Sequence, residues 1–190
     1  KEQVVDDVLV SAFNSAGQRC SSLRILFLPR ETADEVLATL LGAMDELKIG
    51  DPADPTADIG PIIDAEAKAN LDRHVERMKR EAKVLKQIDV SSLGGNYFGP
   101  TVIELASLDQ IEREVFGPIL HVIRYDPADI AAVGAKLAAK GYGLTLGVHS
   151  RLESFAAAVK AAVPAGNVYV NRTIVGAVVG VQPFGGSGLS

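Results

Sequence analysis

The 190 residues are enough for one domain with a substantial core, and 47% hydrophobic with 23% charged residues is typical of a globular protein. The net charge of −5 argues against a surface that neutralises phosphates, so nucleic acid is not an expected partner. One cysteine excludes an intramolecular disulfide or a cysteine-cluster metal site, and no apolar run approaches the ~18 residues of a spanning helix, so we expect a cytoplasmic setting and no membrane partner.

Helix-like and strand-like patterns alternate along the chain. Apolar residues at helical spacing predict a first helix from Val4 to Ala16, stopped by Gly17. Thr32 and Glu35 have the spacing of a capping box at the start of a second helix, which runs to about residue 47. Further helices are predicted over residues 64–82, 129–140 and 152–163, and strands over residues 23–28, 84–88, 101–105, 117–125, 144–150 and 166–171. This order indicates an α/β fold with an open, twisted, largely parallel sheet and helices on both faces.

The two ends of the chain lie inside predicted structure. Lys1 begins within a helical pattern, and Ser190 closes a glycine-rich loop. We therefore expect residues 1–190 to form a single domain that is cut from a longer protein. Because sites in open parallel sheets gather at the carboxyl ends of the strands, the loops are the expected places for chemistry.

The first candidate loop is "GQRCSS", residues 17–22. A lone cysteine is commonly a small buried apolar residue. The neighbours of Cys20 are instead polar or small, and the loop joins a helix end to a buried strand, where a side chain can point into a cleft. Cysteine attacks only as the thiolate, so catalysis would need a nearby base or cation. The local sequence leaves both a nucleophile and a buried thiol open.

The second candidate loop is "EVFGP", residues 114–118. A solvated surface charge is the simpler interpretation of an isolated glutamate such as Glu114. The Gly117-Pro118 pair, however, breaks the chain sharply just before a buried strand. A carboxylate at that point can accept hydrogen bonds from two sugar hydroxyls, and Phe116 can pack against a flat ring.

The third candidate loop is the glycine-rich tail from Thr173 to Ser190. A flexible surface loop is the simpler interpretation, but valines and Phe184 are interspersed among the glycines, unlike a solvated linker. Glycines such as Gly176 let backbone N–H groups approach a ligand and form an anion-binding cradle. The spacing does not match a nucleotide phosphate loop.

The three histidines give no metal-ligand pattern. His74 falls on a charged helix face, where we expect it to be solvated. His121 and His149 fall in strand patterns far apart in the sequence, so no metal site is expected.

Together and in this order, the three loops resemble the aldehyde dehydrogenase superfamily. "GQRC" is similar to its nucleophile motif, "EVFGP" to its nicotinamide-ribose motif and "PFGGSGLS" to the late loop of its active-site wall. "YGLTLGVHSR" and "GNVYVNR" are also similar to that family, so the resemblance covers essentially the whole chain. More narrowly, "IVGAVVGVQPFGGSGLS" resembles the pyrroline-5-carboxylate (glutamate semialdehyde) dehydrogenase modules of bacterial bifunctional proline-catabolism enzymes.

The resemblance implies NAD-dependent aldehyde oxidation. It implies that Cys20 attacks the aldehyde to form a thiohemiacetal, which passes hydride to NAD and leaves a thioester for hydrolysis. The backbone N–H of Cys20 would bind the oxyanion, Glu114 would hold the nicotinamide ribose, and Phe116 would pack near the nicotinamide.

The resemblance also implies how L-glutamate 5-semialdehyde would be held. The backbone N–H groups of Gly176 and Ala177, with the hydroxyl of Ser21, would bind its charged head. Phe184 would pack against the methylenes between that head and the aldehyde.

Several parts of the family's machinery have no counterpart in this chain. The general-base glutamate, the oxyanion asparagine, the cofactor domain and the oligomerisation segments are all expected in the missing domains of the longer protein. That protein is expected to be a homo-oligomer, with FAD in a proline dehydrogenase domain, and the isolated segment to be inactive. A different aldehyde substrate, or a non-catalytic scaffold, remains an alternative.

Overall fold

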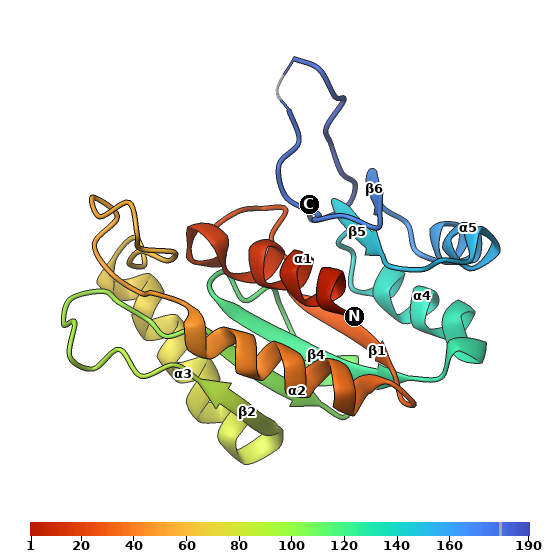
Figure 1. Ribbon diagram of the computed structural model, residues 1–190. Coiled ribbons are helices and arrows are strands. Elements are labelled where there is room, and N and C mark those ends of the chain that lie inside the picture. Colours follow the sequence, from red (N-terminus) through yellow and green to blue (C-terminus); the bar gives the residue numbers. More distant parts are fainter. Residues whose placement is uncertain (179) are drawn as a thin grey trace.

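The computed structural model describes residues 1–178 and 180–190 (Figure 1). The α-helices are α1 (Glu2–Phe13), α2 (Ala33–Ala43), α3 (Ala65–Glu81), α4 (Ile130–Ala139) and α5 (Glu153–Ala162). The strands are β1 (Ile25–Pro29), β2 (Lys83–Gln87), β3 (Thr101–Leu105), β4 (Ile119–Tyr125), β5 (Thr145–Val148) and β6 (Asn167–Val170). Among the described residues, no helix is both long and apolar enough to cross a membrane.

The strands divide between two sheets. The larger sheet has the order β1-β4-β3-β2, in which β4 runs parallel to β1 and β3 while β2 is antiparallel to β3. The smaller sheet pairs β5 with β6 in parallel. The predicted α/β class with a largely parallel sheet is therefore confirmed. The loops that carry Cys20 and Glu114 precede β1 and β4, so they lie at the amino ends of these strands and not at the predicted carboxyl ends.

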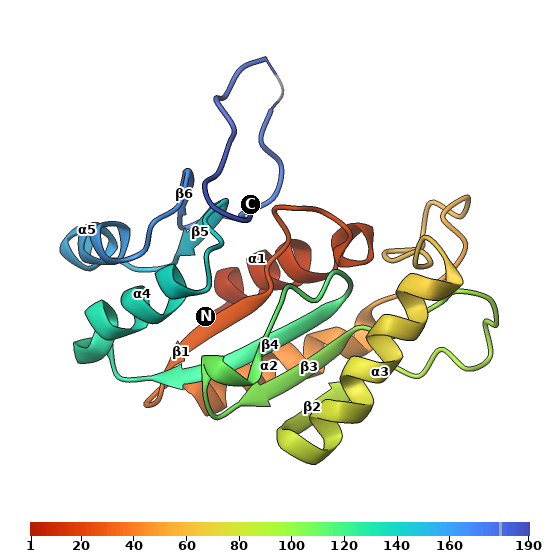
Figure 2. The same cartoon turned by 180° about the vertical axis from the view of Figure 1, so that it is seen from behind.

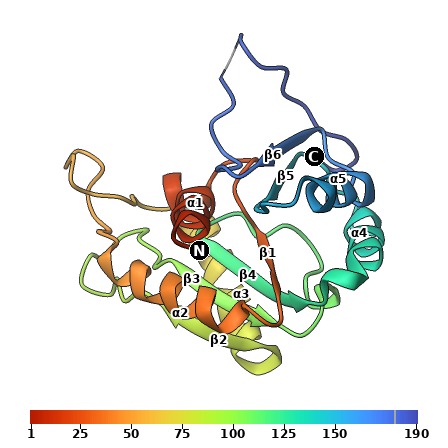
Figure 3. The ribbon, with the colours of Figure 1, turned by 45° about the vertical axis from the view of Figure 1, so that its right-hand side comes forward.

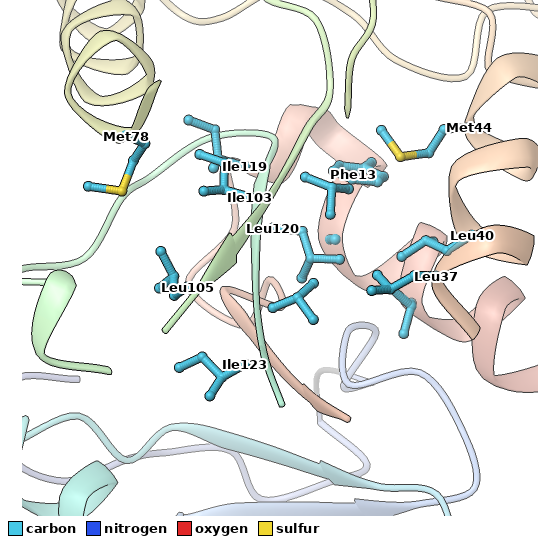
Figure 4. Packing of buried hydrophobic residues seen from close by; sticks show 14 of the residues in the cluster. Phe13, Leu37, Leu40, Met44, Met78, Ile103, Leu105, Ile119, Leu120 and Ile123 are labelled. Atoms are coloured by element: carbon cyan, nitrogen blue, oxygen red, sulfur yellow. The ribbon is translucent and has the colours of Figure 1, made fainter. Parts of the chain in front are cut away.

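Helices cover both faces of the larger sheet, α1 and α2 on one side and α3 on the other (Figures 1 and 2). Neighbouring residues of β4 point to opposite faces, so Ile119 lies towards Met78 of α3, whereas Leu120 lies towards Phe13 and Leu40 (Figure 4). All five of these side chains are at most 1% exposed. The buried core on both faces fixes the strand register from which the site loops begin.

One face of α1 contacts the segments that follow β5 and β6, and Figure 3 shows the smaller sheet with α4 and α5 to the right of α1. Residues 3, 7 and 11 are spaced by four and so share this face. Gln3 donates to the carbonyl of Asn171, Asp7 lies 3.4 Å from Nε2 of His149, and the hydroxyl of Ser11 accepts from the backbone N–H of Ile174 at 3.2 Å. The contacts are polar, and they connect the first helix to segments at the other end of the chain.

The predicted capping box at α2 is wrong. Thr32 has helical backbone angles (φ −111°, ψ −6°), so its hydroxyl makes no bond to the free N–H groups of the first turn. Glu35 instead pairs with the side chain of Lys1. By contrast, Asp64 is in extended conformation before α3 and accepts the N–H of Ala67 at 2.7 Å.

Two helical glycines provide a matched test of the packing. A methyl group on Gly134 of α4 would lie 2.2 Å from the carbonyl oxygen of Ala162 in α5, whereas one on Gly42 of α2 would meet nothing within 4 Å. We expect Gly134→Ala to lower the free energy of unfolding by about 1–3 kcal/mol. Gly42→Ala should raise it by about 0.5–1 kcal/mol, because alanine favours a helix. Urea denaturation measures both, and equal effects would refute the close contact between α4 and α5.

Candidate active site

The turn that carries Cys20 follows a left-handed exit from α1. Ser15, Ala16 and Gly17 have φ values of 56°, 54° and 62°, a conformation that costs free energy in the two residues with side chains. A turn from Arg19 to Ser22 follows, closed by a hydrogen bond of 3.1 Å between the N–H of Ser22 and the carbonyl of Arg19. The thiol of Cys20 is exposed, so the alternative of a buried thiol does not hold.

The two predicted motifs meet at a pair of glycines. A methyl group on Gly17 would lie 2.2 Å from the carbonyl oxygen of Gly117, so only glycine permits this approach. A methyl group on Gly117 would in turn lie 2.6 Å from Cδ1 of Leu71 in α3. The "GQRC" and "EVFGP" loops, a hundred residues apart in the sequence, are therefore in backbone contact.

Arg24 ties these two loops together, a role that the sequence analysis did not predict. Its Nη1 donates to the carbonyl of Gly17 at 2.6 Å and lies 3.3 Å from that of Gly117, and its Nη2 donates to Arg19 at 2.9 Å. Its Nε donates to Oε1 of Glu114 at 3.0 Å, and its guanidinium carbon lies 4.6 Å from the ring centroid of Phe116. One side chain thus contacts both loops and both predicted cofactor-binding residues.

The charge of Arg24 is largely removed from water. Its side chain is 16% exposed, and burial lowers its pKa, an effect opposed by the carboxylate of Glu114. Arginine stays charged in proteins, so its planar donors hold several acceptors in fixed directions. Glu114 and Phe116 remain 34% and 46% exposed, which leaves both open to a ligand.

A cavity of about 790 Å³ lies between β1 and the segment around β5. Cys20, Arg24 and Glu114 contribute to its lining, and its walls are mainly apolar side chains of β1, α4 and β5. The structure therefore brings the predicted nucleophile and the predicted ribose-binding carboxylate to one cavity.

The predicted substrate-binding residues lie elsewhere. Ser21 is buried, and its carbonyl accepts from the hydroxyl of Thr145 at 3.4 Å. The segment that holds Gly176, Ala177 and Phe184 extends away from both sheets (Figure 1). None of these four residues belongs to the described lining of the cavity. Gly176 has φ +92°, with open space where a side chain would lie, so the conformation, not crowding, favours glycine there.

The prediction that His74 is solvated is wrong. His74 of α3 lies with its Nε2 2.9 Å from Nε2 of His121, which is 1% exposed in β4. Burial lowers the pKa of His74 to about 4, aided by the charge of Arg77. Burial also lowers the pKa of His121 to about 3, aided by the neighbouring His74. Both rings are therefore neutral at pH 7. Within the described residues, no group of three or more histidine, cysteine or acidic side chains could hold a metal ion.

Comparison with known proteins assigns the family. The whole chain, residues 1–190, matches the model of the aldehyde dehydrogenase family, to which it therefore belongs. It is 50% identical to the bifunctional protein PutA of Escherichia coli K12, covering all of this chain and 15% of that protein. It is 32% identical to 1-pyrroline-5-carboxylate dehydrogenase of Geobacillus sp. WCH70, covering 37% of that enzyme.

Solved structures give the same relationship. A mutant of Proline Utilization A from Bradyrhizobium japonicum superposes with a TM-score of 0.96 at 51% identity, over all of this chain and 19% of that one. A 1-pyrroline-5-carboxylate dehydrogenase from Thermus with bound NAD gives a TM-score of 0.87 at 34% identity, over 99% of this chain and 36% of that one. The chain thus spans a minor part of each relative's length.

Replacing Arg24 tests its role at the loop junction. Arg24→Met would leave the carbonyls of Gly17 and Arg19 without their donor and the carboxylate of Glu114 without its cation. We expect the free energy of unfolding to fall by about 2–4 kcal/mol. Arg24→Lys should restore less than half of this loss, because one ammonium cannot reach all the acceptors. Arg19→Met, which removes one exposed contact, is the control, and urea denaturation is the measurement.

The histidine pair predicts a pH dependence of stability. Both histidines are neutral in the folded state at pH values where the unfolded chain, with an ordinary pKa of 6.5, binds protons. The two histidines therefore leave the free energy of unfolding unreduced above pH 6.5. They lower it as the pH drops below 6.5, and this effect levels off near pH 3–4. Between pH 7 and 5 the buried His121 should cost about 2 kcal/mol, and the half-buried His74 less. Unfolding of His74→Gln at both pH values should show a smaller difference than the unchanged protein.

Proposed function

We propose that the longer protein containing this segment oxidises L-glutamate 5-semialdehyde, formed from 1-pyrroline-5-carboxylate, to L-glutamate with NAD in proline catabolism. The observation that carries the proposal is the junction at Arg24, which holds the exposed Cys20 turn and Glu114 beside one cavity. The names of the similar proteins, bifunctional PutA and 1-pyrroline-5-carboxylate dehydrogenase, support this choice of substrate.

In the proposed reaction, the thiol proton of Cys20 passes to the general base of another domain. The thiolate sulfur then forms a bond to the aldehyde carbon, the C=O double bond opens, and the carbonyl oxygen becomes an oxyanion. The backbone N–H of Cys20, for which no acceptor is found among the described residues, would donate to that oxyanion. Loss of hydride from the carbon then leaves a thioester on Cys20. Water hydrolyses the thioester, releases glutamate and restores the thiol.

Glu114 and Phe116 fit the nicotinamide half of NAD. Arg24 holds one carboxylate oxygen of Glu114, which orients the carboxylate while the side chain stays partly exposed, as acceptance from ribose hydroxyls requires. The ring of Phe116 has one contact with the guanidinium of Arg24 and is 46% exposed, so it offers apolar surface to a flat ring. NAD, when bound, supplies the acceptor for the hydride.

The charged head of the semialdehyde would be bound by the glycine-rich segment. The positive φ of Gly176 turns the backbone at that point, and the adjacent N–H of Ala177 would add a second donor. The hydroxyl of Ser21, next to the nucleophile, and the ring of Phe184 would complete the contacts. Because the segment that holds these residues extends away from the sheets (Figure 1), we propose that it meets the substrate within the complete protein.

The complete protein would supply the remaining parts. We propose that residues 1–190 form one catalytic domain, that the cofactor domain, the general base and the oxyanion asparagine lie in other domains, and that the protein is a cytoplasmic homo-oligomer. An FAD-dependent proline dehydrogenase domain would form the second activity of the same chain. The share of 15% that this segment covers in PutA of Escherichia coli leaves room for all of these.

The test uses the full-length protein and two aldehydes. Cys20→Ala should abolish NADH formation while NAD binding persists. Ala177→Leu should lower kcat/KM about tenfold or more for glutamate semialdehyde, which needs charge-assisted hydrogen bonds, and much less for an uncharged aldehyde of similar length. Val181→Leu enlarges an exposed residue of the same segment and serves as the control.

Four outcomes would contradict the proposal. Equal losses for both aldehydes would mean that the segment does not select the substrate. Preference of the unchanged protein for the uncharged aldehyde would indicate a different substrate. Full turnover by Cys20→Ala, or no turnover by the unchanged protein, would refute the catalytic role of this segment.

A further inference from the structure

The chemistry proposed above makes no use of His74 and His121, yet His121 contacts the backbone of Arg24. His121 lies in β4 on the face towards α3, directly opposite Ile25 of β1. Its backbone N–H and its ring Nδ1 lie 3.0 and 3.1 Å from the carbonyl oxygen of Arg24. A carbonyl oxygen only accepts, so the Nδ1 of His121 carries the proton.

This assignment fixes the direction of the whole chain of hydrogen bonds. With Nδ1 protonated and the ring neutral, Nε2 of His121 is an acceptor. Nε2 of His74, 2.9 Å away, must then be the donor, and the two rings meet edge to face at 88°. His74 therefore donates to His121, and His121 donates to Arg24.

The same face of α3 also supports the "EVFGP" loop. Residues 71, 74 and 77 are spaced by three and lie on one side of the helix. Leu71 packs against Gly117, and Arg77 donates to the carbonyl of Gln110 at 3.2 Å and pairs with Glu112 at 3.3 Å. α3 thus holds the segment leading to Glu114 directly and holds Arg24 through the two histidines.

We propose that His74 is a positioning residue for aldehyde oxidation, acting through His121 on Arg24, an inference that rests on the function proposed above. The guanidinium of Arg24 contacts both loops, and the backbone carbonyl of the same residue is held by His121. With the donor at His74, the ring of His121 has one tautomer and one orientation, and the carbonyl of Arg24 keeps both of its donors. Without it, the Nδ1 proton can move to Nε2, which removes one of the two donors from the carbonyl and loosens the junction.

Three variants of the full-length protein separate this role from packing. The amide nitrogen of His74→Gln can reach the position of the lost Nε2 and donate to His121. The shorter side chain of His74→Asn keeps the polarity without that reach, and His74→Met fills the space without a donor. Glu76→Met, on the exposed side of α3, is the control.

We expect kcat to fall about three- to tenfold in His74→Asn and His74→Met and less than about twofold in His74→Gln. The Kd for NAD should rise about threefold or more in the first two variants, because Glu114 is less well placed, while the Kd for AMP, which lacks the nicotinamide half, stays unchanged. A purely structural role would change the two affinities together and would not be restored by glutamine.

Equal activities in the Asn and Gln variants, or parallel losses of NAD and AMP affinity, would overturn the proposal. If His74→Met does not fold, the comparison of Asn with Gln decides alone. Failure of the proposed function is distinguishable, because the unchanged protein would then show no turnover or Cys20→Ala would retain it. Failure of the positioning role leaves the unchanged protein active, Cys20→Ala inactive and the histidine variants alike.

Discussion

The candidate active site depends on the burial of one positive charge, that of Arg24. A buried charge without partners is costly in free energy. The guanidinium of Arg24 therefore keeps the surrounding carbonyls, carboxylate and aromatic ring together, because their separation would leave the charge without partners. The left-handed residues before Cys20 become tolerable for the same reason. Their conformational cost is offset by the hydrogen bonds that Arg24 donates to the Gly17 and Arg19 carbonyls.

The sheet makes this junction possible. Arg24 immediately precedes β1, and the Gly117-Pro118 pair immediately precedes β4. These strands are adjacent and parallel, so the loops before them emerge side by side at the same edge. The glycines at both positions then allow the backbones to touch, and the guanidinium fills the remaining space. The contact between the glycines and the burial of the Arg24 charge thus both follow from the adjacent, parallel placement of β1 and β4.

Much of this could be predicted from the sequence, because it depends on local pattern. The apolar run "TVIEL" gave the bounds of β3, and Asp64 gave the start of α3. The exit from α1 and the failed cap at Thr32 depend on backbone angles set by contacts elsewhere. Arg24 has no local signature, since Glu114, Phe116 and Gly117 belong to a loop about ninety residues away in the sequence.

His74 is different, because a signal was present. Its neighbours Asp72, Arg73 and Glu76 suggested a solvated face. Yet the buried residues of α3 are Leu71, Val75 and Met78, and position 74 follows 71 by three residues and precedes 78 by four, so it borders the same side of the helix. A helical projection would have placed His74 at the edge of the buried stripe. Its partner, His121 of β4, could not be predicted, because the two residues are 47 positions apart in the sequence.

The polar face of α1 has a consequence for the time course of synthesis. The partners of Gln3 and Ser11 follow them by 168 and 163 residues, so this helix emerges from the ribosome about ten to thirty seconds before they do. An apolar face left uncovered for that interval would invite aggregation. The amide of Gln3, the carboxylate of Asp7 and the hydroxyl of Ser11 remain hydrated during that interval without such risk. This face of α1 therefore stays available until Asn171 and Ile174 have been synthesised.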